Sequence, residues 1–154
     1  MKLVEVFAPG CFEPDLRSTT KREAIQELVD LLVRKGQLPR SRAADAMDAL
    51  MAREKLGSTG VGRGIAVPHA THKSVKRVVG AIGLSNKGID FRSLDGQPAD
   101  LLFLILSPPD SPERLEALKL VSEFVMEQDL CRFLRQAGDP QSAQDLLKEA
   151  ETRL

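Results

Sequence analysis

Only two cysteines, Cys11 and Cys131, occur in the 154-residue chain. Two cysteines are too few for a disulfide framework, and neither has the close partner that a zinc-binding pair requires. We therefore expect the protein to reside in a reducing compartment.

The chain also has no excess of charge of either sign, because Lys and Arg total 22 and Asp and Glu total 22. Without net positive charge, general attraction to nucleic-acid phosphates has no source beyond a local patch. The longest apolar run, residues 101–106, is far shorter than the ~20 residues of a membrane span. Glu5 interrupts the N-terminal apolar run that a signal peptide would need. We expect a cytoplasmic protein with no nucleic-acid partner and no membrane insertion.

Two segments near the N-terminus, residues 21–35 and 42–55, place apolar residues at helical spacing. Thr20 begins a capping-box pattern before the first segment, and Gly36 can supply the left-handed residue that ends it. Ser41 is the expected N-cap of the second helix.

The middle of the chain changes to strand-like patterns. A short strand is predicted over residues 65–67, ending at Pro68 and His69, followed by apolar strands over 78–84 and 99–106. Residues 86–88 (NKG) predict a turn. Strands this apolar indicate a sheet that is buried on both faces.

Helical spacing returns after Pro112, and further helices are predicted around residues 130–134 and after Asp139. No repeat or long linker divides the chain. The order of helices, strands and helices predicts an α/β protein: one domain over residues 1–154, with a mixed central sheet flanked by helices on both faces.

Both histidines lie in the segment VPHATH, residues 67–72. A neutral imidazole keeps a lone pair on one ring nitrogen near its ordinary pKa of about 6.5, so histidine is a natural phosphoryl acceptor at neutral pH. Pro68 restricts the backbone just before His69.

Anion-binding groups precede these histidines. The glycine-rich run over residues 57–64 could bring backbone amides close to a phosphate. Ser58 and Thr59 add hydroxyl donors, and Arg53 adds a planar guanidinium. The residue types alone therefore make a phosphate site one of several possible roles for this segment.

The segment EKLGSTGVGRGIAVPHA, residues 54–70, resembles the active-site signature of the fructose/mannitol-type enzyme IIA family of the bacterial phosphotransferase system. That family includes stand-alone nitrogen-regulatory IIA proteins. The resemblance continues through residues 88–91, 95–98 and 101–106, so it covers nearly the whole chain.

This resemblance implies that His69 is the phosphorylated residue, with Nε2 as the reacting nitrogen. The phosphoryl group would come from an HPr-like carrier and pass to a IIB domain or serve as a regulatory signal. The resemblance further implies that Arg53 is the active-site arginine and that the fold is the type 2 enzyme IIA sandwich. No cofactor is expected, because the donor is already a phosphohistidine.

One position departs from the family pattern. Many members have a second active-site histidine at the start of the helix after the last core strand, and Arg114 occupies that position here. A guanidinium there can neutralise phosphoryl oxygens at any pH, but it can also indicate impaired transfer. Arg114 remains open between a site residue and a solvated helix start.

Other readings also remain open. His72 can lie beside the phosphoryl group or simply on the surface. Arg53 can form a surface ion pair instead of holding phosphate, and Ser58 and Thr59 can merely shape a turn. The alternative functions are a non-catalytic IIA-like binding module and, more remotely, a zinc hydrolase that uses His69 with His72.

Overall fold

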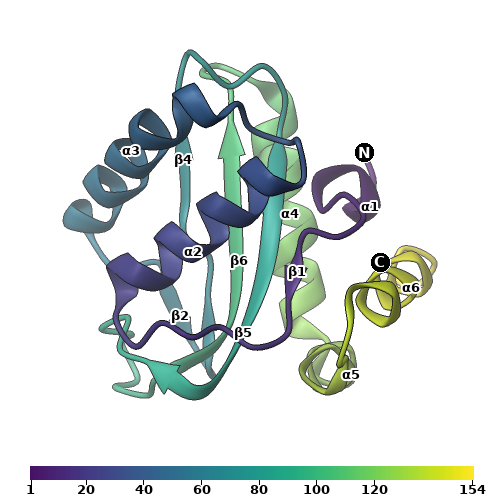
Figure 1. Ribbon diagram of the computed structural model, residues 1–154. Coiled ribbons are helices and arrows are strands. Elements are labelled where there is room, and N and C mark those ends of the chain that lie inside the picture. The colour runs from purple at the N-terminus through teal and green to yellow at the C-terminus, as the bar shows by residue number, and fades with distance from the viewer.

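Two long strands form the centre of the sheet. β5 (Val79–Ile89) and β6 (Ala99–Ser107) pair antiparallel along most of their length. The computed structural model describes residues 1–154 and shows every β6 side chain except that of Asp100 buried. Burial on both faces follows because helices pack in front of and behind these strands (Figure 1).

Short strands complete the sheet at both edges. β1 (Phe12–Glu13) runs parallel to β5, while β3 (Ile65–Ala66) and β4 (His69–Thr71) both run parallel to β6. β2 (Gly60–Gly62) pairs antiparallel with β3. The strand order is β1-β5-β6-β3-β2, with β4 continuing the β3 edge, so the predicted mixed sheet is confirmed.

Helices cover the two faces in separate groups. The bounds of the α-helices are α1 (Leu3–Val6), α2 (Lys21–Arg34), α3 (Ala43–Leu56), α4 (Pro112–Met126), α5 (Gln128–Gln136) and α6 (Pro140–Ala150). α2 and α3 share one apolar core with the sheet, and the other four helices share a second core on the opposite face. The predicted α/β fold is confirmed. None of these helices combines the length and apolarity that a membrane span requires.

Most predicted helix ends lie at the expected residues. The Thr20 hydroxyl accepts a hydrogen bond from the Glu23 N–H at 3.2 Å, and Gly36 ends α2 with φ of +71°. Asp139 caps α6 by accepting from the Ser142 N–H at 2.8 Å. Each cap satisfies a backbone group that a helix terminus leaves without a partner.

The prediction of Ser41 as a helix cap is wrong. Residues Arg40–Arg42 form a 3₁₀ turn, and α3 begins only at Ala43. Pro39 starts this turn with φ of −61°, and its carbonyl accepts the Arg42 N–H at 2.9 Å. Since proline fixes that φ angle, the chain curves one residue before Ser41 and leaves it inside the turn.

The predicted turn at residues 86–88 lies inside β5 instead of ending it. Pairing with β6 is irregular between Leu84 and Ile89. Gly88 takes a φ of +79°, and its N–H donates to the Ser85 hydroxyl at 3.0 Å. The local signal for chain reversal is therefore real, but it produces an irregularity in the strand and not a hairpin.

Candidate functional site

His69 begins a strand, which corrects the expectation that it ends one. β3 stops at Ala66 and β4 starts at His69, because Pro68 has no N–H to continue the ladder. The Pro68 carbonyl still accepts the Ile105 N–H at 2.9 Å, so both short strands stay on the same edge of β6.

Ala70 faces the core beneath α2 and α3. Since side chains alternate along a strand, His69 lies on the opposite face, the one covered by α4.

The imidazole of His69 is half-buried and has one defined partner. Its Nδ1 lies 2.7 Å from the Val67 carbonyl oxygen. A carbonyl oxygen only accepts hydrogen bonds, so Nδ1 carries the proton. In the neutral ring, Nε2 then keeps its lone pair, and no protein group hydrogen-bonds to it.

His72 has a different environment. Its Nδ1 accepts the Ser74 N–H at 3.1 Å and lies 2.7 Å from the Ser74 hydroxyl. The His72 N–H donates to the Ser107 carbonyl at 3.1 Å, which holds the end of β4 beside the end of β6. These contacts give His72 a turn-forming role. No three His, Cys, Asp or Glu side chains of the chain come together as a metal site would require.

Arg53 lies in the last turn of α3, which packs against β4. Its Nη1 donates to the Gly57 carbonyl at 2.9 Å, so the side chain holds the helix end and the following loop together. The remaining guanidinium N–H groups have no protein acceptor. A guanidinium held by one bond keeps a fork of donors free for an oxyanion.

The hydroxyls of Ser58 and Thr59 already donate hydrogen bonds to acceptors within the protein. Thr59 is buried and donates to the Glu54 carboxylate, and Ser58 donates to the Phe91 carbonyl while accepting the Gly60 N–H at 2.9 Å. This geometry supports the turn-shaping reading of both residues.

Glu54 is a structural residue whose importance was not evident from the sequence. Its carboxylate is buried, lies 3.0 Å from the Lys21 Nζ and accepts both the hydroxyl and the N–H of Thr59. Lys21 Nζ also lies 5.2 Å from the centre of the Phe91 ring. The ion pair thus connects α2, α3 and the loop that follows Arg53. Its only sequence signal is an acidic residue within the segment 54–70.

Lys21→Met is expected to lower the free energy of unfolding by about 2 to 3 kcal/mol, because the buried Glu54 carboxylate loses its charged hydrogen bond and keeps only the donors of Thr59. Urea unfolding followed by circular dichroism measures the change. Lys55→Met removes an exposed lysine one residue from Glu54 and should change stability little. Equal effects in the two variants would show that the ion pair has no special importance.

The glycine-rich run forms a hairpin, and the N–H groups of four of its residues donate to acceptors within the protein: Gly57, Thr59, Gly60 and Arg63. β2 and β3 are joined by Arg63 and Gly64, whose φ angles are +57° and +79°, as a type I′ turn requires. The Arg63 N–H donates to Asp95 at 2.9 Å. This bond, with a second from the Gln97 N–H, holds the pKa of Asp95 below its ordinary value. Gly60 has no space for a side chain, because a Cβ would collide with Ser93.

Arg114 lies in the first turn of α4, half-buried. Its guanidinium forms no hydrogen bond or ion pair with the protein. α4 follows the C-terminal end of β6, where Ser107 pairs with Thr71 of β4. Arg114 is therefore an unpaired cation at the start of the helix that covers the His69 face, on the side of the sheet where β4 and β6 end.

Comparisons with known proteins agree with this architecture. The family model for "Phosphoenolpyruvate-dependent sugar phosphotransferase system, EIIA 2" matches residues 5–150. A nitrogen regulatory protein of Bradyrhizobium diazoefficiens is 33% identical over 148 residues, covering 96% of this chain and 95% of that protein. The fructose-specific EIIA component of Haloferax volcanii is 41% identical over 131 residues, 84% of each chain.

A solved structure supports the same assignment. The nitrogen regulatory protein IIA-Ntr from Neisseria meningitidis superposes with a TM-score of 0.79 at 29% identity, covering 93% of this chain and 97% of that one. IIA mannitol from Escherichia coli, with a TM-score of 0.74 and 22% identity over 90% of this chain and 96% of that one, shares the fold. With a family match across nearly its whole length, this chain belongs to the EIIA 2 family of the phosphoenolpyruvate-dependent sugar phosphotransferase system.

Proposed function

We propose that the chain is a phosphocarrier in which Nε2 of His69 accepts a phosphoryl group from an HPr-like phosphohistidine protein. The group then passes to a IIB-type acceptor or acts as a regulatory signal. The observation that supports this role best is the 2.7 Å contact between His69 Nδ1 and the Val67 carbonyl. It orients the ring and leaves Nε2 as the nucleophile.

Transfer of the phosphoryl group from the donor imidazole to His69 needs neither a metal ion nor a hydrolytic water. The Nε2 lone pair attacks phosphorus in line, and the P–N bond of the donor breaks as the new bond forms. The electron pair of the broken bond stays on the donor imidazole. The proton on His69 Nδ1 remains in place, and its hydrogen bond to Val67 strengthens as the ring becomes cationic.

Arg53 and Arg114 are the proposed partners of the phosphoryl oxygens, because both keep guanidinium donors that no protein group uses. The loop that follows α3 reaches the His69 segment, where the Thr59 carbonyl accepts the Val67 N–H at 3.0 Å. Ser58 and Thr59 are left out of the phosphate contacts, since their hydroxyls donate within the protein. We propose no direct phosphate contact for His72, whose backbone N–H bonds to the Ser107 carbonyl and so joins β4 to β6. Permanent charge at residue 114, where the family resemblance implies a histidine, would make this contact independent of pH.

Arg53→Ala is expected to slow phosphorylation of His69 by between about tenfold and about a thousandfold, since a charged hydrogen bond that strengthens in the transition state is lost. The measurement is the initial rate of labelling by a phosphorylated HPr-type donor. Thermal unfolding of the same variant reports the separate loss of the bond to Gly57. A labelling rate equal to that of the unmodified chain would remove Arg53 from the site.

Arg114 also favours a second candidate, a IIA-like regulatory module that binds partners without productive transfer. Incubation with a phosphorylated HPr-type donor separates the two functions. Acid-labile phosphate on the chain supports the carrier, and its absence under conditions that label a fructose-specific EIIA supports the binding module.

Some relatives are named nitrogen regulatory proteins and others fructose-specific EIIA components, so both a regulatory target and a sugar-transport acceptor are candidate downstream partners. As a regulator, the chain would present a phosphoryl dianion in one state and a neutral ring in the other, which changes the electrostatic fit to a target. We place this exchange in the cytoplasm, where the unpaired thiols of Cys11 and Cys131 would remain reduced.

A further inference from the structure

A polar cavity lies away from His69. It has a volume of about 420 Å³ and lies between the β2–β3 turn and α5. Ile65 in its wall pairs with Leu101, whereas His69 pairs with Ile105, four residues further along β6. At about 3.3 Å per residue, the two places are separated by roughly 13 Å along the sheet.

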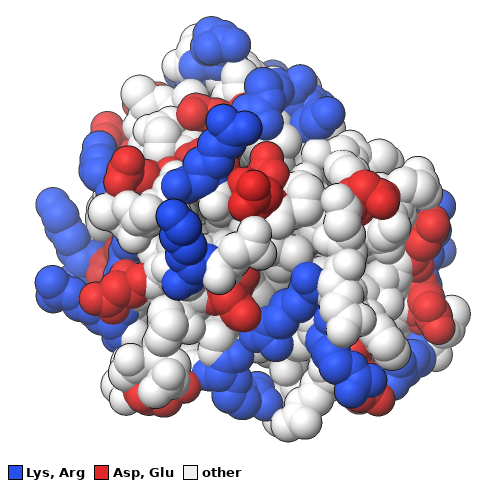
Figure 2. All heavy atoms as spheres, turned by 60° about the horizontal axis from the view of Figure 1, so that its bottom comes forward, with Lys and Arg blue, Asp and Glu red and all other residues white.

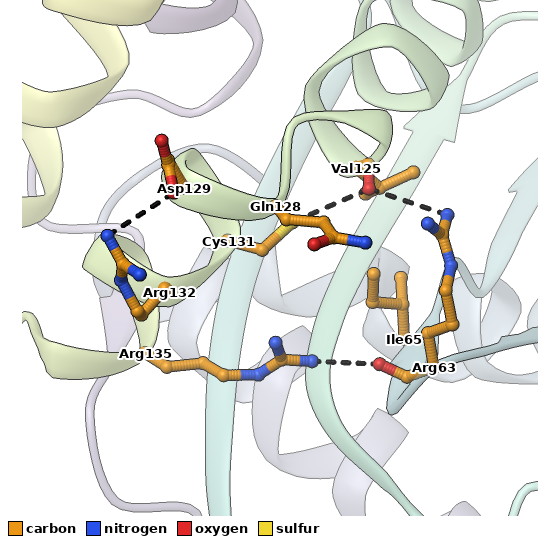
Figure 3. A pocket seen from close by; sticks show the side chains of 8 residues that line it. All are labelled: Arg63, Ile65, Val125, Gln128, Asp129, Cys131, Arg132 and Arg135. Atoms are coloured by element: carbon orange, nitrogen blue, oxygen red, sulfur yellow. Dashed lines mark hydrogen bonds and ion pairs between the residues drawn. The ribbon is translucent and has the colours of Figure 1, made fainter.

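Arginine side chains surround this cavity. Arg63 and Arg132 stand on opposite sides of it, and Arg135 extends between them (Figure 3). Near the middle of the lower part of the face in Figure 2, several Lys and Arg side chains lie close together, with Asp and Glu side chains to either side of them.

The three guanidinium groups differ in how strongly protein acceptors hold them. Arg135 is held by Asp100, at 3.1 and 3.0 Å, and by the Arg63 carbonyl at 3.0 Å. Arg132 uses one nitrogen on Asp129 at 3.2 Å, and Arg63 makes only long contacts, 3.5 Å to the Val125 carbonyl and 3.6 Å to the Met126 sulfur. Two guanidinium forks therefore keep free donors beside the cavity.

The start of α5 supplies further donors. The helix has nine residues, and its N-cap residue, Glu127, provides no side-chain hydrogen bond. The Cys131 N–H is the first to find an acceptor, the Glu127 carbonyl at 3.1 Å, so the amides of Gln128, Asp129 and Leu130 have no protein partner. Unpaired amides at a helix N-terminus favour an anion.

We infer that this cavity binds a small phosphorylated molecule. Free guanidinium forks on two sides, with helix amides on a third, match the acceptor oxygens of a phosphorylated molecule that spans the cavity. The cavity volume is typical of small-molecule sites and leaves space for an organic portion beyond the phosphate. The charges at the cavity are also net positive, with three arginines against Asp129 and the Asp100 that pairs with Arg135.

Cys131 in the cavity wall does not suggest thiol chemistry. Its thiol is buried and directed to the Val125 carbonyl at 3.7 Å, and burial raises its pKa. Since the thiolate is the reactive form, this residue contributes packing.

Pyrophosphate is the probe for the test, titrated at about 0.15 M salt and followed by NMR of backbone amides and arginine Nε–H groups. We expect saturable shifts at Gln128–Leu130 and at Arg63. Arg63→Ala combined with Arg132→Ala should weaken binding by at least about tenfold. The matched control, Arg17→Ala with Arg40→Ala, removes two exposed arginines elsewhere and should leave binding unchanged.

Three outcomes would overturn the inference. The amides could show no saturable response, the pocket double variant could bind as tightly as its control, or chloride added at equal ionic strength could produce the same shifts. A His69→Ala chain serves as a further control, since shifts confined to His69 and lost in this variant would assign the probe to the phosphoacceptor site. No donor protein is used, so the result is independent of whether His69 transfers phosphoryl groups.

Discussion

His69→Ala is expected to reduce labelling of the chain by a phosphorylated HPr-type donor by more than about a thousandfold, because it removes the only nitrogen proposed to bond to phosphorus. The measurement is acid-labile phosphate retained on the chain after a short incubation. Because the His69 ring is half-buried and bonds only to the Val67 carbonyl, the variant should still fold.

His72→Ala is the matched control for this experiment. It removes the only other imidazole of the chain, whose Nδ1 is engaged by Ser74. This variant should keep its label, with a small loss of stability from the lost Ser74 contacts. Phosphate that persists on His69→Ala but disappears from His72→Ala would assign the acceptor role to His72.

Phe103→Ala is expected to lower the free energy of unfolding by about 4 kcal/mol, since it leaves a large cavity in a packed core. Phe103 is fully buried in β6 and makes edge-to-face contacts with Phe7 of the α1 region and Phe124 of α4, at ring-centre distances of 5.9 and 5.8 Å. Its loss therefore loosens the contacts of two helices with the sheet. Urea unfolding, with the slope of the transition fitted, measures the change.

Phe133→Ala gives the comparison for this variant. The same atoms are removed from α5, but the Phe133 side chain is 46% exposed, so it buries less apolar area. We expect a loss of about 1 kcal/mol or less. Similar losses in both variants would mean that the core on the α4 face does not depend on Phe103.

Sequence patterns predicted the parts of the fold that depend on neighbouring residues. Thr20 and Gly36 mark the ends of α2 because a cap and a left-handed residue act within one turn. The apolar run at residues 101–106 is the buried centre of β6 for the same local reason. The very short elements α1, β1 and β2 escaped prediction, since two to four residues carry too little periodicity.

Site residues were predicted as a set, but not with their individual contacts. The Val67–His69 pair lies in one short segment, yet the ring's tautomer depends on the backbone between β3 and β4, which the Ile105 N–H holds to β6 through the Pro68 carbonyl. Thr59 was expected to be a candidate phosphate donor, and its hydroxyl instead meets Glu54, because Lys21 on another helix holds that carboxylate in place.

By itself, the sequence determined the family, the mixed sheet between helices and the identity of the candidate acceptor, His69. These follow from local spacing and from a continuous motif, both of which are visible in the amino-acid sequence. Only the tertiary structure showed the contact that leaves Nε2 of His69 free, which hydroxyls are already bonded and which arginines line the cavity beside α5. Arg63 and Arg132 are 69 positions apart in the chain, and only the packing of α5 against the β2–β3 turn brings them to one place.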